Sequence, residues 1–377
     1  MKTGCRLLFV VTHSAAGGTQ ELWANLTEGL RGRGHDARLI ALYPHEESAS
    51  AGTTGASWRH VVERRPASPV ALLRLLRCLV QLLRTEMQDY IFTAMPAANL
   101  LLPLAATFAR TPAKVVISHH SPVHTYRPLL NLADGAVGLL PKVAAIVCVS
   151  ASVAASLHAK PDAYRRRRRV IHNALPPPIA ALLSRLASRS PRDAALNHRV
   201  VAIGRLAAEK NYPVLIRAAA DLPGATIQIL GSGPDAEILQ ALAAELRTGA
   251  TIEFLGHRPR DAALQMLAAG DIFVQPSLYE GHSLAMLEAA ELGLPLVVSD
   301  VPSQVEGITA ADGQVCGIAV DPHDPVALAS AIKRLLDESA HYRRSSELAH
   351  HLASSSSFDA MLDAYENLIY QKNSTAD

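Results

Sequence analysis

The chain has 377 residues, of which 49% are hydrophobic and 19% are charged, and its formal net charge is +2. This composition is typical of a globular protein with two ordinary domains and excludes a disordered or fibrous chain. The four cysteines form no C-x-x-C pair, so neither a disulfide framework nor a zinc site is predicted and a reducing compartment is favoured.

The charge is unevenly divided along the chain. Residues 1–173 contain 21 lysines and arginines against 10 acidic residues, whereas residues 174–377 contain 15 against 24. A basic first half favours an anionic partner, such as lipid phosphates or a membrane surface, but ordinary solvated charge explains it equally well. The same two alternatives hold for the five consecutive arginines Arg165–Arg169. No aromatic residues interleave with this run, so a nucleic-acid partner is not expected.

The first half of the chain alternates apolar runs with helical patterns. Strands are predicted at 6–12, 37–42, 89–94, 114–118 and 144–150, and helices at 19–33, 69–87 and 150–157. This alternation predicts a parallel, doubly wound domain. The helix over 69–87 is basic and amphipathic, and we favour burial of its leucine stripe against the sheet over binding to a membrane.

Two apolar stretches bear on where the protein is located. Residues 7–11 follow two basic residues but are too few for the core of a signal peptide, so a buried strand is expected. Residues 91–109 carry no charge, but Pro96 and Pro103 interrupt them, which favours a strand and a helix over a membrane span. We therefore expect a cytoplasmic protein, and peripheral contact with the inner face of the plasma membrane stays open.

The second half begins after a stretch rich in proline, alanine and serine. This stretch, residues 176–198, is the predicted linker and is expected to contain one short helix. Further strands are predicted at 199–203, 226–230 and 252–256, followed by a helix at 262–269. The predicted organisation is therefore a first domain over 1–175, the linker, a second domain over 199–350 and a C-terminal segment over 351–377.

Residues 273–300 read as strand, loop, helix and strand, and carry two carboxylates, Glu280 and Glu288. At 3.6 residues per turn, Glu288 lies about one and a half turns inside the helix, so both carboxylates can face one cleft. The N-terminal end of this helix, around Gly281, His282, Ser283 and Leu284, is positive and offers backbone N–H groups suited to a diphosphate. A capped helix with two solvated glutamates is the alternative.

This stretch resembles the donor motif of the family-four retaining glycosyltransferases, which have the GT-B fold. The resemblance is carried by the E-x7-E spacing, the preceding Pro-Ser and the trailing E-A-A-x-x-G-x-P-L-V-V. It implies an α/β protein with two Rossmann-like parallel-sheet domains facing a central cleft. It also implies that Glu280 lies near the donor sugar and that Glu288 binds ribose hydroxyls. The family often has Phe-Gly in place of His282-Ser283, so sugar choice is expected to differ.

Other loops resemble the same family. Residues 204–211 are similar to its G-R-L-x-x-x-K-G motif, with Asn211 for the last glycine, which implies that Arg205 and Lys210 neutralise the leaving diphosphate. The resemblance further assigns Gly231 and Gly233 to the nucleotide pocket, His257 and Arg258 to the base, Gly17 and Gly18 to the acceptor loop, and His119, with His120 in reserve, to the donor sugar. The terminal helix would return to the first domain.

We therefore expect a retaining, metal-independent glycosyltransferase with no cofactor. Its catalytic residues would be His119, Arg205, Lys210 and Glu280. The expected donor is a UDP-linked hexose or N-acetylhexosamine, with GDP-mannose second, and the acceptor a glycan or lipid-linked acceptor in cell-surface polysaccharide synthesis. A nucleotide-sugar epimerase of the same fold and a non-catalytic sugar-binding protein are the alternatives.

Overall fold

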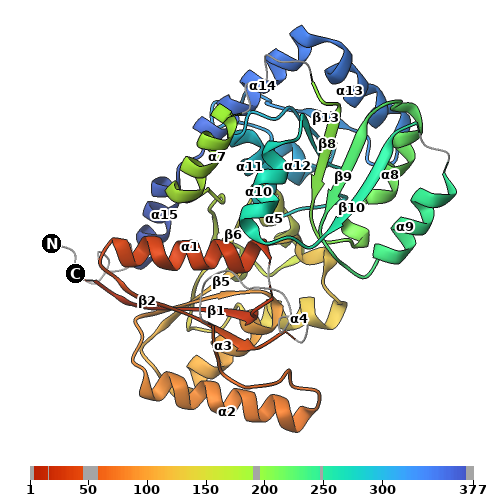
Figure 1. Cartoon of the computed structure of the whole chain (residues 1–377). Helices are drawn as coiled ribbons and strands as arrows, with labels where there is room; N and C mark the ends of the chain where they lie inside the picture. The colour runs from red at the N-terminus through yellow and green to blue at the C-terminus, as the bar shows by residue number, and fades with distance from the viewer. Residues whose placement is uncertain (1–3, 16, 46–57, 190–195, 247–248, 371–377) are drawn as a thin grey trace. The chain divides into compact units, whose positions relative to one another are not determined.

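The computed structural model describes residues 4–15, 17–45, 58–189, 196–246 and 249–370 (Figure 1). The chain divides into two compact units, which are described separately. The first unit comprises residues 1–173 together with 359–377, and the second comprises residues 174–358.

The first unit is a parallel sheet with helices on both faces. In chain order its elements are β1 (Arg6–His13), α1 (Gly18–Gly32), β2 (Asp36–Tyr43), β3 (Arg59–His60), α2 (Pro69–Thr85), β4 (Tyr90–Ala94), α3 (Pro96–Ala109), β5 (Lys114–His119), η2 (Val123–Thr125), α4 (Pro128–Val137), β6 (Val143–Cys148), α5 (Ala151–Ala155), η3 (Ser156–Ala159), α6 (Asp162–Arg165), β7 (Arg168–Val170) and α15 (Phe358–Tyr370). Its strands lie in the order β3-β2-β1-β4-β5-β6-β7, and every neighbouring pair is parallel. Because helices cover both faces of this sheet, its strands read as continuous apolar runs in the sequence.

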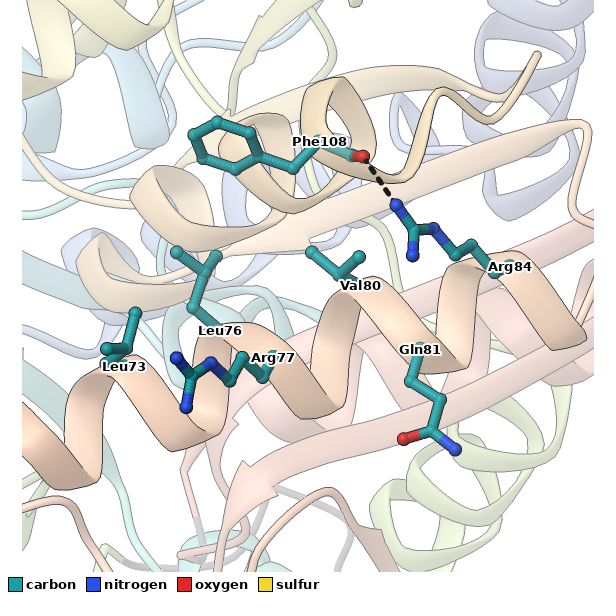
Figure 2. A pocket seen from close by; sticks show the side chains of 7 residues that line it. All are labelled: Leu73, Leu76, Arg77, Val80, Gln81, Arg84 and Phe108. Atoms are coloured by element: carbon teal, nitrogen blue, oxygen red, sulfur yellow. Dashed lines mark hydrogen bonds between the residues drawn. The ribbon is translucent and has the colours of Figure 1, made fainter.

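Helix α2 packs on this sheet through Leu75, Leu79 and Leu83, which are fully buried with Leu8 and Val10 of β1. The predicted leucine stripe therefore does bury against the sheet at these three positions, whereas Leu72, which was expected in it, is 45% exposed. Helix α3 lies beside α2, and the Arg84 guanidinium donates a hydrogen bond to the Phe108 carbonyl at 3.2 Å (Figure 2). Residues 91–109 form β4 and α3, and no helix within the described parts of the chain is both long and apolar enough to span a bilayer.

The C-terminal helix α15 belongs to the first unit. The Tyr90 hydroxyl donates to the Ile369 carbonyl at 2.9 Å, and the Tyr365 ring packs edge-on against Phe92. Arg33, which follows α1, forms ion pairs with three acidic residues, Asp359, Asp363 and Glu366. A helix distant in sequence thus closes the other face of the sheet through both apolar and charged contacts.

The second unit is also a parallel sheet between helices. Its elements are α7 (Pro177–Arg189), β8 (Arg199–Ile203), η4 (Ala208–Lys210), α8 (Tyr212–Ala218), η5 (Ala219–Asp221), β9 (Thr226–Leu230), α9 (Ala236–Glu245), β10 (Thr251–Gly256), α10 (Arg260–Ala268), β11 (Ile272–Gln275), α11 (Leu284–Glu291), β12 (Leu296–Ser299), α12 (Pro302–Gly307), β13 (Ile318–Val320), α13 (Pro325–Asp337) and α14 (Ser339–Ser354). The strand order is β10-β9-β8-β11-β12-β13.

The expected linker is more ordered than its composition suggests. Most of it forms α7, whose Leu183 is fully buried in a core shared with Leu264 and Phe273. This helix is part of the second unit, so the unit boundary falls after Asn173 rather than across residues 176–198. Residues 190–195, within the expected linker, lie outside the described part of the chain.

Candidate active site

The strand order of the second unit identifies where a ligand would bind. From β8 the chain moves outward through β9 and β10, then returns to the other side of β8 for β11, β12 and β13. In open α/β sheets, ligands bind outside the carboxyl ends of the strands at such a reversal point. The loops that follow β8 and β11, residues 204–211 and 276–283, are the two loops at this point, and they contain the predicted site residues Arg205, Lys210 and Glu280.

Glu280 is held in a dense set of hydrogen bonds. Its Oε1 accepts from Lys210 Nζ at 2.5 Å, from Gln275 Nε2 at 2.6 Å and from Ser277 Oγ at 2.7 Å. Its backbone N–H donates to Ser303 Oγ at 3.0 Å. The structure therefore brings together two predicted site residues, Glu280 and Lys210. Gln275 was not predicted, although its position as the last residue of β11 is a signal that could have indicated it.

The two cations of the first loop differ in their surroundings. Lys210 is partly buried and paired with Glu280, whereas the Arg205 side chain is 65% exposed and pairs with Glu209 at 2.8 Å. An exposed ion pair of this kind contributes about 0–1 kcal/mol, so Arg205 can turn toward an anion at little cost. The Lys210 ammonium group is therefore held in position, whereas the Arg205 guanidinium group can reorient.

Asn211 occupies the position of the last glycine in the related motif, and the structure shows why asparagine is suitable there. Its backbone is left-handed, with φ 53° and ψ 35°, a conformation that asparagine adopts more readily than most residues. Its side-chain amide donates to the carbonyls of Pro276, at 3.0 Å, and Pro322, at 2.7 Å. Asparagine therefore satisfies the turn and also ties the first loop to the second.

Gly231 and Gly233 let a third loop approach the first very closely. A Cβ at Gly231 would lie 1.9 Å from the Gly204 carbonyl oxygen, and one at Gly233 would lie 2.2 Å from the Leu206 carbonyl oxygen. Both contacts are with backbone, which cannot move aside cheaply. The two loops are joined by a hydrogen bond from the Leu206 N–H to the Ser232 carbonyl at 2.9 Å. These glycines therefore shape the loop that carries Arg205 and Lys210.

Helix α11 begins at the expected place. Ser283 is its N-cap, and the Ser283 hydroxyl accepts a hydrogen bond from the Met286 N–H at 3.3 Å. Gly281 is buried, while His282 and Leu284 are partly exposed. The first N–H groups of an α-helix have no partner within the helix, and the dipole is positive there, so this end favours an anion.

Glu288 lies one and a half turns into α11, is buried, and forms an ion pair with Arg260. Each of the two predicted carboxylates thus has its own cation, Lys210 for Glu280 and Arg260 for Glu288. Sequence reasoning missed Arg260, the first residue of α10. It named instead the nearby His257 and Arg258, which are exposed after the edge strand β10.

In the first unit the chain reverses between β1 and β4. Gly17 and Gly18 follow β1 and are exposed at the start of α1, where Gly17 is the N-cap and offers no side-chain cap. They therefore lie at the edge of the sheet where a ligand of this unit would be expected. Their assignment to the acceptor stays a prediction.

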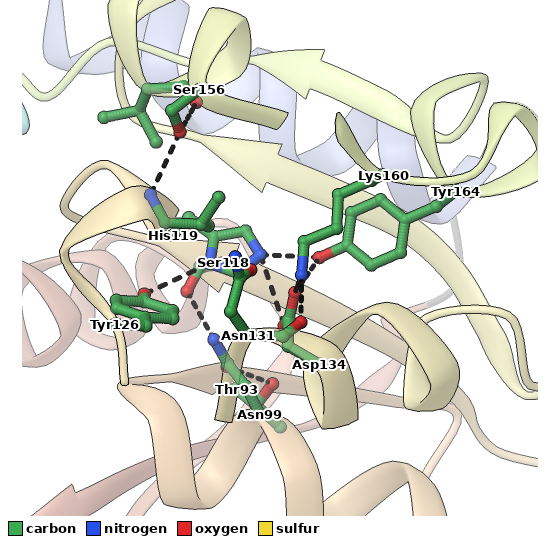
Figure 3. Close-up of polar contacts among 12 residues, drawn as sticks. Thr93, Asn99, Ser118, His119, Tyr126, Asn131, Asp134, Ser156, Lys160 and Tyr164 are labelled. Atoms are coloured by element: carbon green, nitrogen blue, oxygen red, sulfur yellow. Dashed lines mark hydrogen bonds and ion pairs between the residues drawn. The ribbon is translucent and has the colours of Figure 1, made fainter. Parts of the chain in front are cut away.

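His119 is completely buried, in contrast to the expectation that it meets the donor sugar. Figure 3 shows its ring between Tyr126 and Tyr164. Tyr164 donates to Asp134 at 2.9 Å, so its oxygen accepts from His119 Nε2 at 2.7 Å, and the Tyr126 hydroxyl donates to His119 Nδ1 at 3.3 Å. Lys160 completes the network as the ion-pair partner of Asp134 at 2.7 Å.

This arrangement fixes the role that His119 plays in the structure. Burial lowers the pKa of His119 and raises the pKa of Tyr164, so both are neutral. All their polar atoms are used inside the unit. We conclude that His119 does not meet a substrate in this structure, because its side chain has no exposed surface.

His120, the reserve candidate, is partly exposed. Its Nε2 lies 3.1 Å from Nε1 of the buried Trp23. An indole N–H can only donate, so His120 Nε2 is the acceptor and a neutral ring carries its proton on Nδ1. Burial lowers the pKa of His120 to about 3, which keeps the ring neutral. His120 thus has a defined N–H donor at the carboxyl end of β5.

Within the described residues, no group of three or more histidine, cysteine, aspartate or glutamate side chains is placed to hold a metal ion. The candidate site is instead built from backbone N–H groups, two loop cations and hydrogen-bonded carboxylates. Such a set can bind a phosphate-bearing ligand and stabilise negative charge that develops on it. Whether the reaction is independent of metals stays a prediction.

Two family models match the chain, one in each half. Glycosyltransferase Family 4 matches residues 16–177. Glycosyl transferases group 1 matches residues 194–352, which include the loops that follow β8, β9 and β11.

Among known proteins, the chain is 32% identical over 226 residues to a D-inositol 3-phosphate glycosyltransferase of Mycolicibacterium smegmatis, covering 58% of this chain and 50% of that one. It therefore spans about half the length of that protein. It is 27% identical over 357 residues to the lipopolysaccharide core biosynthesis glycosyltransferase LpsD of Rhizobium meliloti, covering 93% and 94% of the two chains.

Among solved structures, Anabaena Alr3699/HepE in complex with UDP and glucose is similar, with a TM-score of 0.77 and 16% identity over 97% of this chain and 100% of that chain. An identity this low shows a shared fold and nothing about shared chemistry.

Proposed function

The chain belongs to the glycosyltransferases of the GT-B fold, and from that membership we propose that it transfers a hexose or N-acetylhexosamine from a nucleotide-sugar to an acceptor, with retention of anomeric configuration. The observation that carries the proposal is the position of two cations, Arg205 and Lys210. They lie on the loop after β8, beside the loop that leads into α11, where the strand order of the second unit reverses. That combination suits a diphosphate.

The residues of this site would act chiefly on the leaving group. Negative charge builds on the nucleotide diphosphate as the bond to the sugar breaks, and preorganised donors are most effective where such charge develops. We infer that Lys210, Arg205 and the N–H groups of residues 281–284 supply this stabilisation. Lys210 is already oriented by Glu280, which Gln275 and Ser277 hold in turn. These positive groups are the reason for proposing that the transfer needs no metal.

Glu288 would bind the ribose hydroxyls of the nucleotide. Its carboxylate is buried, and Arg260 keeps it paired. A buried carboxylate without a partner is costly, so the arginine stabilises the ionised form in the free enzyme. The ribose would then bind beside or in place of the guanidinium.

The donor and acceptor are proposed from the relatives. The HepE structure contains UDP and glucose, and the name of LpsD places it in lipopolysaccharide core synthesis. For this chain we therefore propose a UDP-sugar donor and a glycan or lipid-linked acceptor of the cell surface. His120, rather than His119, is the histidine of the β5 loop that we assign to a substrate hydroxyl, because its side chain is accessible and carries a fixed donor.

Calorimetric titration of the purified chain with UDP-glucose, UDP-N-acetylglucosamine and GDP-mannose tests the proposal. One of these should bind, and the double variant Arg205→Ala/Lys210→Ala should lose most of the affinity. Arg217→Ala, which removes an exposed cation from α8, is the matched control and should bind like the wild type.

The proposal fails if none of the three nucleotide-sugars binds, or if the double variant and the control behave alike. Product analysis with and without an acceptor separates transfer from epimerisation, because an epimerase would convert the sugar with no acceptor present. Measurement of transfer in EDTA, with and without added manganese, tests independence of metals.

A further inference from the structure

The outward side of α2 exposes large apolar side chains that its packing on the sheet does not use. Val70 is 77% exposed and Leu73 is 48% exposed, and both lie outside the buried stripe of Leu75, Leu79 and Leu83. At the end of the neighbouring helix α3, Phe108 is 58% exposed. The helix thus has one apolar stripe for the sheet and further apolar residues that face away from it.

A shallow apolar groove joins Leu73 and Phe108. It has a volume of about 570 Å³ and runs along α2 beside the end of α3, as Figure 2 shows. Its lining includes Leu73, Leu76, Val80 and Phe108, together with the exposed arginines Arg77 and Arg84. The hydrogen bond from Arg84 to the Phe108 carbonyl ties the two helices together at this groove. The groove therefore lies between two helices that a hydrogen bond joins.

The same surface is positively charged. Helix α2 contains Arg74, Arg77 and Arg84 and no acidic residue, and α3 contains no charged residue at all. Among the residues that the structure describes, Arg74 and Arg77 make no hydrogen bond or ion pair. Their guanidinium groups are available to an external partner, and arginine is well suited to phosphate because its donors form a planar fork.

We propose that this surface, formed by Val70, Leu73, Arg74, Arg77 and Phe108 and called here the α2 face, docks on an anionic lipid bilayer. The apolar side chains would enter the boundary between headgroups and acyl chains, and the arginines would bind lipid phosphates. A basic helix with exposed apolar residues lies in the membrane interface for these two reasons. The contact goes beyond the proposed transfer reaction and requires neither donor nor acceptor.

The charge pattern favours a bilayer over a second copy of the chain. In a symmetric dimer the same patch meets itself, so the arginines of the two α2 faces would approach one another. Helix α2 has no carboxylate to compensate them, and like charges at an interface are strongly unfavourable. Anionic phosphates, in contrast, complement the arginines while acyl chains cover the apolar side chains.

Flotation of the full chain with phospholipid vesicles tests the docking. The chain should float with mixed phosphatidylcholine–phosphatidylglycerol vesicles at low salt, weakly at high salt, and not with pure phosphatidylcholine. Arg74→Gln/Arg77→Gln should weaken binding about 25-fold, because each charge near an anionic surface is worth about fivefold. Leu73→Ser/Phe108→Ser should weaken it by about tenfold or more, since both side chains lose apolar contact with the lipid.

Matched controls make the same chemical changes elsewhere. Arg343→Gln/Arg344→Gln on α14 removes two exposed cations, and Ile238→Ser/Val326→Ser on α9 and α13 removes two exposed apolar side chains. Both should float like the wild type. Arg84 is left unchanged because its hydrogen bond to Phe108 contributes to the fold.

Several outcomes would overturn the proposal. They are failure of the wild type to float with anionic vesicles, equal flotation of α2-face variants and controls, and a dimer that the α2-face substitutions convert to monomer. Arg74→Glu/Arg77→Glu, with a Tm like that of the wild type, should abolish flotation. Calorimetric titration of the wild type and the same variants with UDP-sugars distinguishes the two proposals. If the wild type binds no UDP-sugar, that result counts against the transfer reaction only.

Discussion

Lys160 should be essential to the stability of the first unit, because its removal leaves the buried carboxylate of Asp134 without a counter-charge. Its ammonium group is buried and lies 2.7 Å from Oδ2 of the buried Asp134. In Lys160→Met the stem of the side chain is kept, but the carboxylate loses its counter-charge. The Tyr164 hydroxyl at 2.9 Å is then its remaining strong partner.

The expected cost follows from the burial of this pair. Removing one partner of a buried ion pair destabilises a protein by about 3–5 kcal/mol, because the other charge stays in a medium of low dielectric. The second substitution Asp134→Asn should restore a large part of the loss, because it removes the unpaired charge and keeps an acceptor for Tyr164.

The assay is denaturant unfolding followed by tryptophan fluorescence. Both tryptophans of the chain, Trp23 and Trp58, belong to the first unit, so the signal reports the unfolding of that unit. Arg6→Met is the control, because the Arg6–Asp89 pair is exposed and should contribute about 1 kcal/mol or less. If Lys160→Met costs no more than Arg6→Met, the buried network does not carry the stability that we assign to it.

Three further predictions concern the donor site and the first unit. Glu288→Gln should weaken UDP-sugar binding about tenfold or more in calorimetry, since hydrogen bonds to a charged group contribute about 1.5–3 kcal/mol; unchanged affinity would remove Glu288 from the ribose site. Gly233→Ala should lower both donor affinity and the Tm, because its Cβ would lie 2.2 Å from the Leu206 carbonyl oxygen, whereas Gly32→Ala, with nothing within 4 Å, should change neither. The first unit should lose stability as the pH falls from about 6.5, the ordinary pKa of histidine, toward about 4. Burial lowers the pKa of His13 to about 4 and the pKa of His120 to about 3. In this range these histidines therefore bind protons in the unfolded chain but not in the folded one. Fluorescence-detected unfolding that is flat over that range would contradict it.

The strands and the donor-site loops could be predicted from the sequence because their signals are local. Apolar runs mark both sheets, and Ser283 marks the start of α11, where the structure places its N-cap. The short helix expected within the linker corresponds to α7, but its composition gave no sign that this helix buries Leu183 in the core of the second unit. Short elements such as α12 and β13 carry too few apolar residues to stand out.

The pairing of side chains could not be predicted in the same way. Arg260 and Glu288 lie 28 positions apart, and only the packing of α10 against α11 brings them together. The choice between His119 and His120 was, in contrast, open to sequence reasoning. Strand β5 is buried on both faces from Val115 to its last residue, His119, so a histidine within the strand was the poorer candidate. The next residue, beyond the strand end, is the one that is accessible.

A crystal structure of the chain with a bound UDP-sugar would test the central claim most directly. We expect the two phosphates within hydrogen-bond distance of the backbone N–H groups at the start of α11, with Lys210 and Arg205 on the neighbouring loop in contact with them. A diphosphate bound elsewhere on the second unit, with the end of α11 covered by side chains, would contradict the proposed site.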